Sequence, residues 1–313
     1  MRIWKMLVHK LRDSYKSNKR TIITIGNYDG VHKGHIYILE KLTHLAKDNN
    51  LDSVLITFNP HTKTVVNQTD FKVITTLEDK IILSDKLNID FLCEVEFNNT
   101  IKSLSYKEFI ELIINKYHPS IILIGYDNKF GKNRDGTYKL LKEHLKETDI
   151  EVLECQEYDS NDCKVTTTNI KNNINKYNIC LANKLLGRNY SLKGKVVNGQ
   201  NIGKNIGYPT ANIKINSFEQ LIPPNGVYSV TLEVDNKKYK SICNIGYCPT
   251  IKKNCVEITI EVHVINQNLQ LYGKNITIEF IDFIRKEHKF NTKEDLVKQI
   301  KKDILKVNLK GYK

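Results

Sequence analysis

The sequence predicts an α/β domain built on a parallel sheet, followed by a small antiparallel β-barrel domain with a C-terminal helix. In the first half of the 313 residues, apolar strand-like runs alternate with stretches of helical apolar spacing. From Ser191 onward the apolar residues recur with period two between turns. A length of 313 residues, at roughly 150 per domain, fits two domains. The change of pattern divides the chain into residues 1–184 and 185–313.

The first half is expected to alternate strand and helix. Strands are predicted at 21–25, 53–58, 90–95 and 120–124, and helices at 34–47, 76–87 and 106–117. Strands separated by helices of this length form right-handed crossovers, which make the sheet parallel. This half is therefore predicted to be an α/β layer fold of the nucleotide-binding type.

The second half is expected to be a barrel with a terminal helix. Strands are predicted at 193–197, 228–234, 238–245, 256–265 and 276–281, a spacing typical of a small antiparallel barrel. The helix is predicted over 293–307, with Asn291 as its cap and Glu294 completing a capping box. Its apolar stripe consists of Leu296, Ile300, Ile304 and Val307.

Composition disfavours several classes of protein. An apolar content of 40% and a charged content of 27% are ordinary for a globular chain. No apolar run approaches the roughly 20 residues of a membrane span, and the charged N-terminus leaves no room for a secretory signal. The seven cysteines form no Cys-x-x-Cys pair, which argues against a disulfide scaffold or a structural zinc site. A cytoplasmic protein with reduced thiols is predicted.

The net charge of 48 − 35 = +13 permits a polyanionic partner. The lysines are scattered along the chain, however, and no basic patch interleaved with aromatic residues is found. A nucleic-acid-binding protein therefore stays an alternative, and solvated lysine faces are favoured.

The first polar motif follows the first predicted strand and runs from Gly26 to His35 (GNYDGVHKGH). His32 and His35 are three residues apart at a helix start, so their N–H donors can project to one side and add to the helix dipole. Such a site can stabilise charge growing on an α-phosphate while pyrophosphate leaves. The segment is predicted to bind a triphosphate through Gly26, Asn27, Asp29 and Gly30, with His32 and His35 as the catalytic pair.

This string resembles the signature of the bacterial bifunctional riboflavin kinase/FMN adenylyltransferase (FAD synthetase) family. Segments 57–61, 75–80 and 125–131 resemble further family blocks in the family's order, with Asn59 where glutamate is usual. The resemblance covers essentially the whole chain. It implies a Rossmann-like nucleotidyltransferase domain followed by a flavokinase barrel.

The resemblance also implies ligand contacts in the first domain. Asp127, Phe130 and Arg134 match the block that contacts the flavin. The family's phosphate loop corresponds to Thr166, Thr167, Thr168 and Lys171, with lysine in place of the family's arginine. Lysine keeps the charge and loses the two-pronged geometry. A kinase-only protein with a weakened adenylyltransferase domain therefore remains an alternative.

In the second domain, segment 203–212 resembles the flavokinase signature. The Thr210 hydroxyl and the Asn212 carbonyl, two residues apart, suit Mg²⁺, which prefers oxygen ligands and borrows phosphate oxygens. Gly203 and Gly207 provide a loop able to wrap phosphates. These four residues are the predicted metal and ATP site of the barrel.

Phosphoryl transfer to an alcohol also needs a base beside the hydroxyl. The strand 257–264 alternates apolar and polar residues, and its Glu-Val-His string aligns the family's catalytic glutamate with Glu261; Glu257 is a local rival. Arg285 matches a family position near the flavin and the product phosphate.

The resemblance implies two reactions, phosphorylation of riboflavin by MgATP and adenylylation of FMN to FAD. The expected partners are therefore riboflavin, FMN and ATP, with Mg²⁺ as cofactor and without nucleic acid or membrane.

Overall fold

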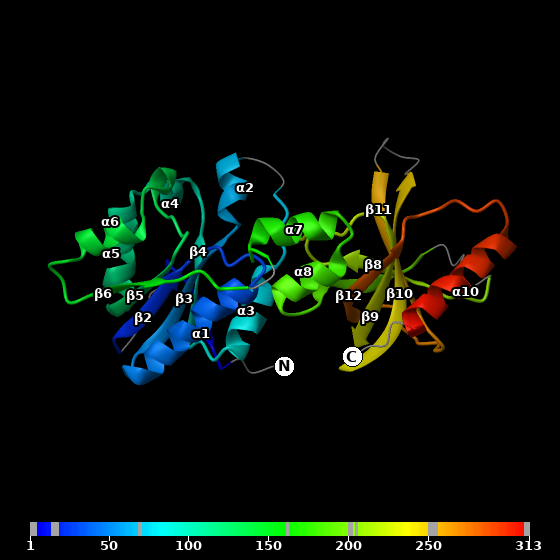
Figure 1. The fold of residues 1–313 in the computed structure, drawn as a ribbon, viewed down its shortest axis with the longest axis horizontal. Helices are drawn as coiled ribbons and strands as arrows, with labels where there is room; N and C mark the ends of the chain where they lie inside the picture. Colours follow the sequence, from blue (N-terminus) through cyan, green and yellow to red (C-terminus); the bar gives the residue numbers. More distant parts are fainter. Residues whose placement is uncertain are drawn as a thin grey trace. The chain divides into compact units, whose positions relative to one another are not determined.

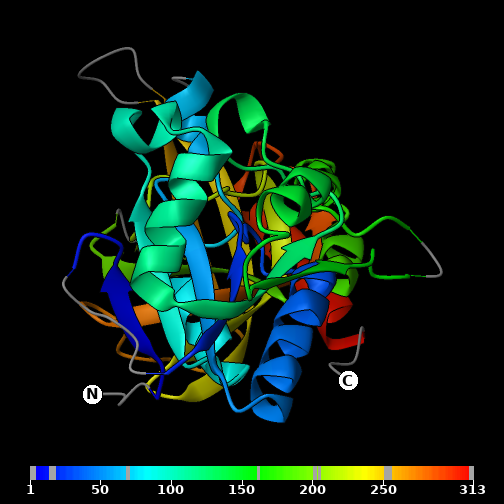
Figure 2. The same ribbon diagram turned by 90° about the vertical axis from the view of Figure 1, so that its left-hand side faces the viewer.

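The computed structural model describes residues 5–13, 19–67, 71–160, 163–199, 203, 206–249 and 256–309. The chain divides into two compact units, Met1–Thr167 and Thr168–Lys313, and each is described by itself (Figures 1 and 2).

Unit 1 contains a parallel sheet of six strands in the order β1-β4-β3-β2-β5-β6. The four predicted strands form its centre, and β1 and β6, which were not predicted, form its edges. The strands are β1 (Leu7–Lys10), β2 (Thr21–Ile25), β3 (Asp52–Asn59), β4 (Phe91–Glu96), β5 (Pro119–Gly125) and β6 (Glu151–Cys155).

Helices cover both faces of this sheet (Figure 1). One apolar cluster packs α1 and α3 against one face, and a second packs α5 and α6 against the other. The three predicted helices are confirmed to within one residue at each end. The helices are α1 (Lys33–Asp48), α2 (Thr62–Asn67), α3 (Leu77–Lys86), α4 (Asn99–Ser103), α5 (Tyr106–Tyr117) and α6 (Tyr138–His144).

The strand order determines where unit 1 can bind a ligand. The chain moves from β2 to β3 and β4 on one side, then crosses to β5 on the other side of β2. In parallel α/β sheets, ligands bind at the carboxyl ends of the strands where the order reverses in this way. The loops that follow β2 and β5 therefore border the expected crevice.

Unit 2 contains a closed antiparallel barrel in the order β10-β11-β8-β7-β12-β9. The five predicted strands are present and β8 is additional. Helices α7 (Thr167–Asn175) and α8 (Ile179–Leu186) precede the barrel, and α8 packs on β7 and β12. The strands are β7 (Tyr190–Val197), β8 (Ala211–Ile215), β9 (Gly226–Val234), β10 (Lys237–Pro249), β11 (Val256–Val264) and β12 (Asn275–Arg285).

The C-terminal helix α10 (Lys293–Leu309) packs on the barrel through Val307, which is 1% exposed in an apolar cluster with Val227 and Ile242. The predicted cap was wrong by one residue. The Asp295 N–H donates to Thr292 Oγ1 (3.1 Å), and Thr292 Oγ1 donates to Asp295 Oδ2 (2.8 Å). Among the described residues, no helix is long and apolar enough to cross a membrane.

Candidate active sites

The loop between β2 and α1 is fixed to neighbouring strands and helices by hydrogen bonds. The Gly26 N–H donates to the Ile56 carbonyl (3.0 Å). Asn27 Nδ2 donates to Thr62 Oγ1 (2.9 Å), and Asn27 Oδ1 accepts from the Thr62 N–H (3.2 Å). The Asn27 side chain thus joins the loop to the start of α2 and fixes the conformation of the loop.

Asp29 and Gly30 attach the loop to the segment at Ile74 and Thr75. Asp29 is 1% exposed, and its Oδ1 accepts from the N–H groups of Ile74 (2.7 Å) and Thr75 (3.2 Å). The Gly30 N–H donates to Thr75 Oγ1 (2.9 Å). The Asp29 carboxylate thus holds the backbone of the neighbouring segment, and the buried anion is stabilised by these N–H donors.

The two predicted histidines lie together at the start of α1. Their rings stack with centroids 3.6 Å apart and planes 14° apart. His32 caps the helix because its Nδ1 accepts from the His35 N–H (3.2 Å). A neutral His32 ring that accepts at Nδ1 carries its proton on Nε2, which is then a donor suited to a phosphate oxygen. The predicted pairing of the two histidines is thus present in the geometry.

Tyr28 packs against His35 of this pair. It packs edge-on to His35 with ring centroids 5.1 Å apart, and its hydroxyl lies 2.7 Å from Thr24 Oγ1. Burial raises the pKa of Tyr28 above its ordinary value, and the bond to Thr24 offsets part of that rise. The phenol therefore stays protonated and acts as a rigid support.

The start of α7 is joined to the same loop. Thr167 Oγ1 donates to the Asp29 carbonyl (2.9 Å). Thr166 precedes the helix, Thr168 is exposed in its first turn, and Lys171 lies one turn further and is half-buried. The predicted phosphate loop is thus a helix N-terminus, where N–H groups and the dipole favour anions.

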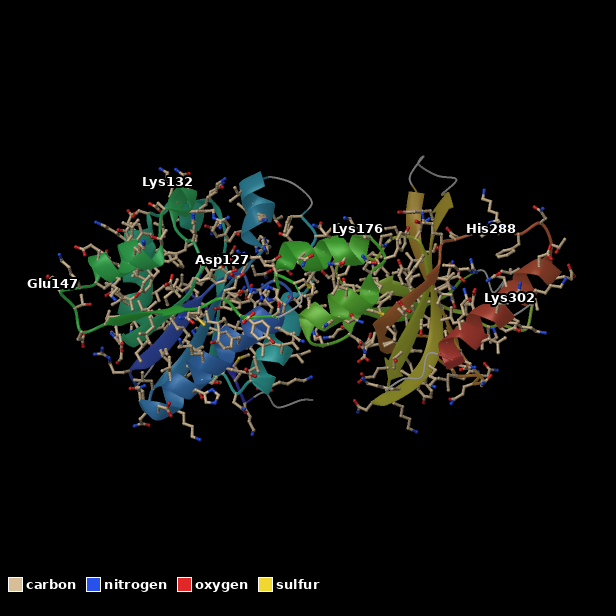
Figure 3. All side chains as sticks on the ribbon, in the orientation of Figure 1. Asp127, Lys132, Glu147, Lys176, His288 and Lys302 are labelled. Atoms are coloured by element: carbon tan, nitrogen blue, oxygen red, sulfur yellow. The ribbon has the colours of Figure 1, made fainter. Side chains whose placement is uncertain are left out.

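The predicted flavin residues follow β5. Asp127, labelled in Figure 3, and Arg134 are exposed. Phe130 is 6% exposed, and its ring packs in the core with its centroid 6.5 Å from that of Phe109. Asn128 Nδ2 donates to the Ile25 carbonyl, which ties this loop to the end of β2.

In the barrel, Thr210 and Glu261 are in direct contact. Thr210 Oγ1 donates to Glu261 Oε2 (3.1 Å), and Glu261 on β11 pairs with Asn212 on β8. Burial confirms the predicted alternation from Ile260 onward, because Ile260 and Val262 are 3% and 1% exposed while Glu261 is half-buried. Ile258, predicted on the same buried face, is 43% exposed. The side chain of the rival, Glu257, lies outside the described part of the chain.

The barrel register places three predicted residues in one row. Asn212 is opposite Glu261, Glu261 is opposite Asn244, Asn244 is opposite Val227, and Val227 is opposite Arg285. Directly opposite residues of antiparallel strands share a face. At roughly 4.8 Å per strand, Arg285 lies about 14 Å from Glu261 along this row. Asn244, which no sequence motif marks, is placed in this row by the strand register alone.

Arg285 is held in place by the terminal helix. Its Nε donates to Asp303 Oδ2 (2.9 Å), and Gln299 Nε2 donates to Asp303 Oδ1 (2.8 Å). Asp303 is 1% exposed. No motif marks Asp303, although a carboxylate beside an apolar helical stripe is a signal of a buried partner.

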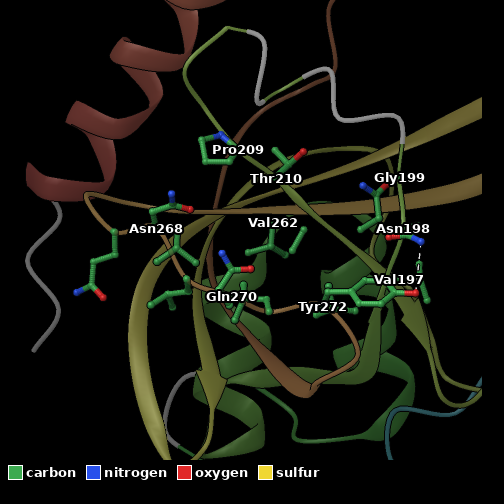
Figure 4. Close-up of a pocket in the computed structure, with 16 residues that line it drawn as sticks. Val197, Asn198, Gly199, Pro209, Thr210, Val262, Asn268, Gln270 and Tyr272 are labelled. Atoms are coloured by element: carbon green, nitrogen blue, oxygen red, sulfur yellow. Dashed lines mark hydrogen bonds between the residues drawn. The ribbon is translucent and has the colours of Figure 1, made fainter.

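A cavity of about 210 Å³ borders this site (Figure 4). Thr210 and Asn212 line it with Val262 and Tyr272, and Tyr272 accepts from Asn198 Nδ2 (3.3 Å). The cavity is smaller than the roughly 300–1,000 Å³ of a typical pocket for a drug-sized ligand.

The predicted glycines shape the turn before Thr210. The Tyr208 N–H donates to the Gly203 carbonyl (2.8 Å), and a Cβ on Gly203 would lie 2.3 Å from the Tyr208 oxygen. Gly207 has φ +82°, a conformation that favours glycine.

Cys243 directly precedes Asn244 on β10, and its side chain is fully buried. Burial raises the pKa of its thiol, and the charge of Glu261 raises it further. This thiol therefore stays protonated and inert.

Comparison with known proteins covers both halves of the chain. Residues 14–169 match the family described as FAD synthetase, and residues 186–309 match the family described as riboflavin kinase. A bifunctional riboflavin kinase/FMN adenylyltransferase of Buchnera aphidicola subsp. Schizaphis graminum is 38% identical over 303 residues, 95% of this chain and 96% of that protein.

A protein of the same name from Bacillus subtilis is 36% identical over 291 residues, 91% of this chain and 90% of that protein. A crystal structure described as a macrolide-efflux protein from Streptococcus pneumoniae superposes with a TM-score of 0.88 at 27% identity, covering 97% of this chain and 99% of that chain. The chain belongs to the bifunctional riboflavin kinase/FMN adenylyltransferase family.

Proposed function

We propose that this protein makes FAD from riboflavin in two ATP-dependent steps, each at its own site. One observation supports this most directly: the chain contains both a stacked histidine pair at a helix start and a Thr210–Glu261 pair in a barrel. The first suits nucleotidyl transfer and the second phosphoryl transfer. We assign the former to residues 1–184 and the latter to residues 185–313.

In the kinase step, the riboflavin 5′-hydroxyl attacks the γ-phosphorus of ATP and ADP leaves. Glu261 takes the proton of that hydroxyl, and Arg285 lies in the same row to bind flavin or product phosphate. Gly203 and Gly207 shape the loop that approaches the ATP phosphates.

Thr210 and Asn212 fit a Mg²⁺ ion. A hydroxyl that donates its proton to a carboxylate keeps two lone pairs, and Thr210 is in this state. Asn212 adds a second oxygen from the strand position opposite Glu261. The ion, when bound, neutralises charge on the phosphates.

In the adenylyltransferase step, an FMN phosphate oxygen attacks the α-phosphorus of ATP and pyrophosphate leaves. His32 and His35 donate to the phosphates, beside the loop from Gly26 to Gly30. Thr166, Thr167, Thr168 and Lys171 contribute hydroxyls, helix N–H groups and a positive charge. Asp127 and Arg134 are the proposed flavin contacts, and Phe130 supports their loop from the core.

We further propose that the enzyme works in the cytoplasm. In the described part of the chain, no disulfide joins Cys93, Cys155, Cys163, Cys180 or Cys243, which suits a reducing compartment.

The test is to incubate the purified protein with riboflavin, ATP and Mg²⁺ and to separate the flavins by chromatography, with a parallel reaction started from FMN. Both FMN and FAD are expected. FMN as the only product, with supplied FMN also left unchanged, would select the kinase-only alternative. Unchanged riboflavin and unchanged FMN would refute both activities.

A further inference from the structure

Side-chain contacts hold the turn at Pro209 and Thr210 to β11. The β8–β11 ladder pairs Asn212 with Glu261 and Ala211 with Val262, and no further backbone pair joins these strands among the described residues. Continuing the register would place Thr210 opposite His263. Instead, Thr210 Oγ1 donates to Glu261 Oε2 (3.1 Å), and His263 Nδ1 lies 2.9 Å from the Pro209 carbonyl oxygen.

The partner of His263 determines the direction of its hydrogen bond. A carbonyl oxygen only accepts, so Nδ1 carries a hydrogen and donates to Pro209. The Tyr208 ring packs edge-on to the imidazole, with centroids 5.4 Å apart and planes at 70°. The ring orientation is therefore fixed from two sides by the segment that leads into Thr210.

We propose that His263 is a positioning residue of the kinase site. Its Nδ1–H fixes the Pro209 carbonyl and thereby the turn that presents the Thr210 hydroxyl and the Asn212 oxygen next to Glu261. This inference rests on the proposed function, in which those two oxygens bind Mg²⁺. Without the bond, the turn is held to β11 by Thr210 and a two-residue ladder.

A rival role is proton acceptance by Nε2. His263 is two residues from Glu261 on the same face of β11, about 6.7 Å along the strand. Two substitutions separate the roles. His263→Asn keeps a donor at the position of Nδ1, one bond beyond Cγ, and does not titrate. His263→Gln carries its donor one bond further out, at the position of Nε2. Both remove the ring.

The experiment measures riboflavin phosphorylation by the full chain against Mg²⁺ concentration at fixed ATP. His263→Gln is expected to raise the Mg²⁺ concentration for half-maximal rate by roughly 2–10-fold, the value of one hydrogen bond, with the riboflavin KM unchanged. His263→Asn is expected to restore the wild-type midpoint. A loss of folded protein alone would lower the rate without moving that midpoint, and adenylylation of FMN is the control for an intact chain.

Equal losses of 10²-fold or more in both variants would make His263 a proton acceptor and overturn the positioning role. Thr210→Ala separates this inference from the function on which it rests. If Thr210→Ala moves the Mg²⁺ midpoint and His263→Gln does not, the positioning role is refuted. If neither moves it, the metal assignment at Thr210 is itself refuted.

Discussion

Replacing Asp303 with asparagine should destabilise the barrel unit far more than the same change at an exposed ion pair. Asp303 is 1% exposed and accepts from Arg285 Nε (2.9 Å) and Gln299 Nε2 (2.8 Å). Asparagine keeps the size of the side chain and removes its charge. The Arg285 guanidinium, with a side chain only 20% exposed, then loses its counter-ion.

The magnitude follows from burial. A hydrogen bond to a charged group contributes about 1.5–3 kcal/mol, and removing one partner of a fully buried ion pair costs about 3–5 kcal/mol. Because Arg285 is partly solvated, we expect Asp303→Asn to lower the free energy of unfolding of the barrel unit by about 2–3 kcal/mol. The matched control is Asp235→Asn. Its Lys274 Nζ–Asp235 Oδ2 distance is 2.6 Å, but the side chains are 42% and 66% exposed. Such a pair contributes at most about 1 kcal/mol.

Hydrogen exchange read by peptide suits this comparison, because a chain of two units need not unfold in one step. The opening free energies of α10 and β12 should fall in Asp303→Asn and stay nearly unchanged in Asp235→Asn, while peptides of unit 1 serve as the internal reference. Equal effects of the two substitutions would refute the docking of α10 through a buried ion pair.

Three substitutions test the proposed active sites by steady-state kinetics. The double change His32→Ala and His35→Ala should abolish FMN adenylylation and leave riboflavin phosphorylation nearly intact; loss of both activities in a folded variant would contradict independent sites. Glu261→Gln should lower phosphorylation by roughly 10²–10⁴ and spare adenylylation of supplied FMN. A larger loss from Glu257→Gln would show that the base is Glu257, four residues before the assigned position. Lys171→Ala should weaken adenylylation by at least about tenfold, and Lys171→Arg should preserve or raise it, since arginine can bind two phosphate oxygens. Three equal rates for wild type and both variants would place Lys171 outside the mechanism.

The four central strands of unit 1 and five strands of the barrel could be predicted because each is a continuous or alternating apolar run. The two edge strands of unit 1 and β8 of the closed barrel could not. β1 is four residues long and partly exposed, and β6 has the sequence EVLEC, so neither has a strong periodic signal. β8 covers five residues, and only its pairing with β7 and β11 makes it a strand.

The cap of α10 illustrates a different limit. Asn291 with Glu294 and Thr292 with Asp295 both fit a capping box, and local pattern cannot choose between neighbouring registers. The side-chain bonds select Thr292.

For the proposed sites, the sequence motifs mark the loops, and the structure shows which groups each side chain contacts. Asp29 and Phe130 belong to segments near the proposed ligands, yet one side chain binds backbone and the other packs in the core. That division depends on which way each side chain turns, and a motif does not encode it. The contact of Asp303 with Arg285 becomes apparent only from tertiary packing, and the position of Asn244 opposite Glu261 only from the strand register.

The irregular pairing of β12 makes chain length, and not only residue identity, a determinant of the proposed kinase site. From Phe280 to Arg285 the strand advances five residues while β9 advances three, from Val230 to Val227. With unbroken pairing, Phe283 would lie opposite Val227 and an apolar ring would replace the guanidinium in the row. Deleting one residue between these bulges would rotate Arg285 toward the barrel interior, since neighbouring strand positions face opposite sides. This strand should therefore accept exchanges of side chains at several positions but reject any single-residue deletion.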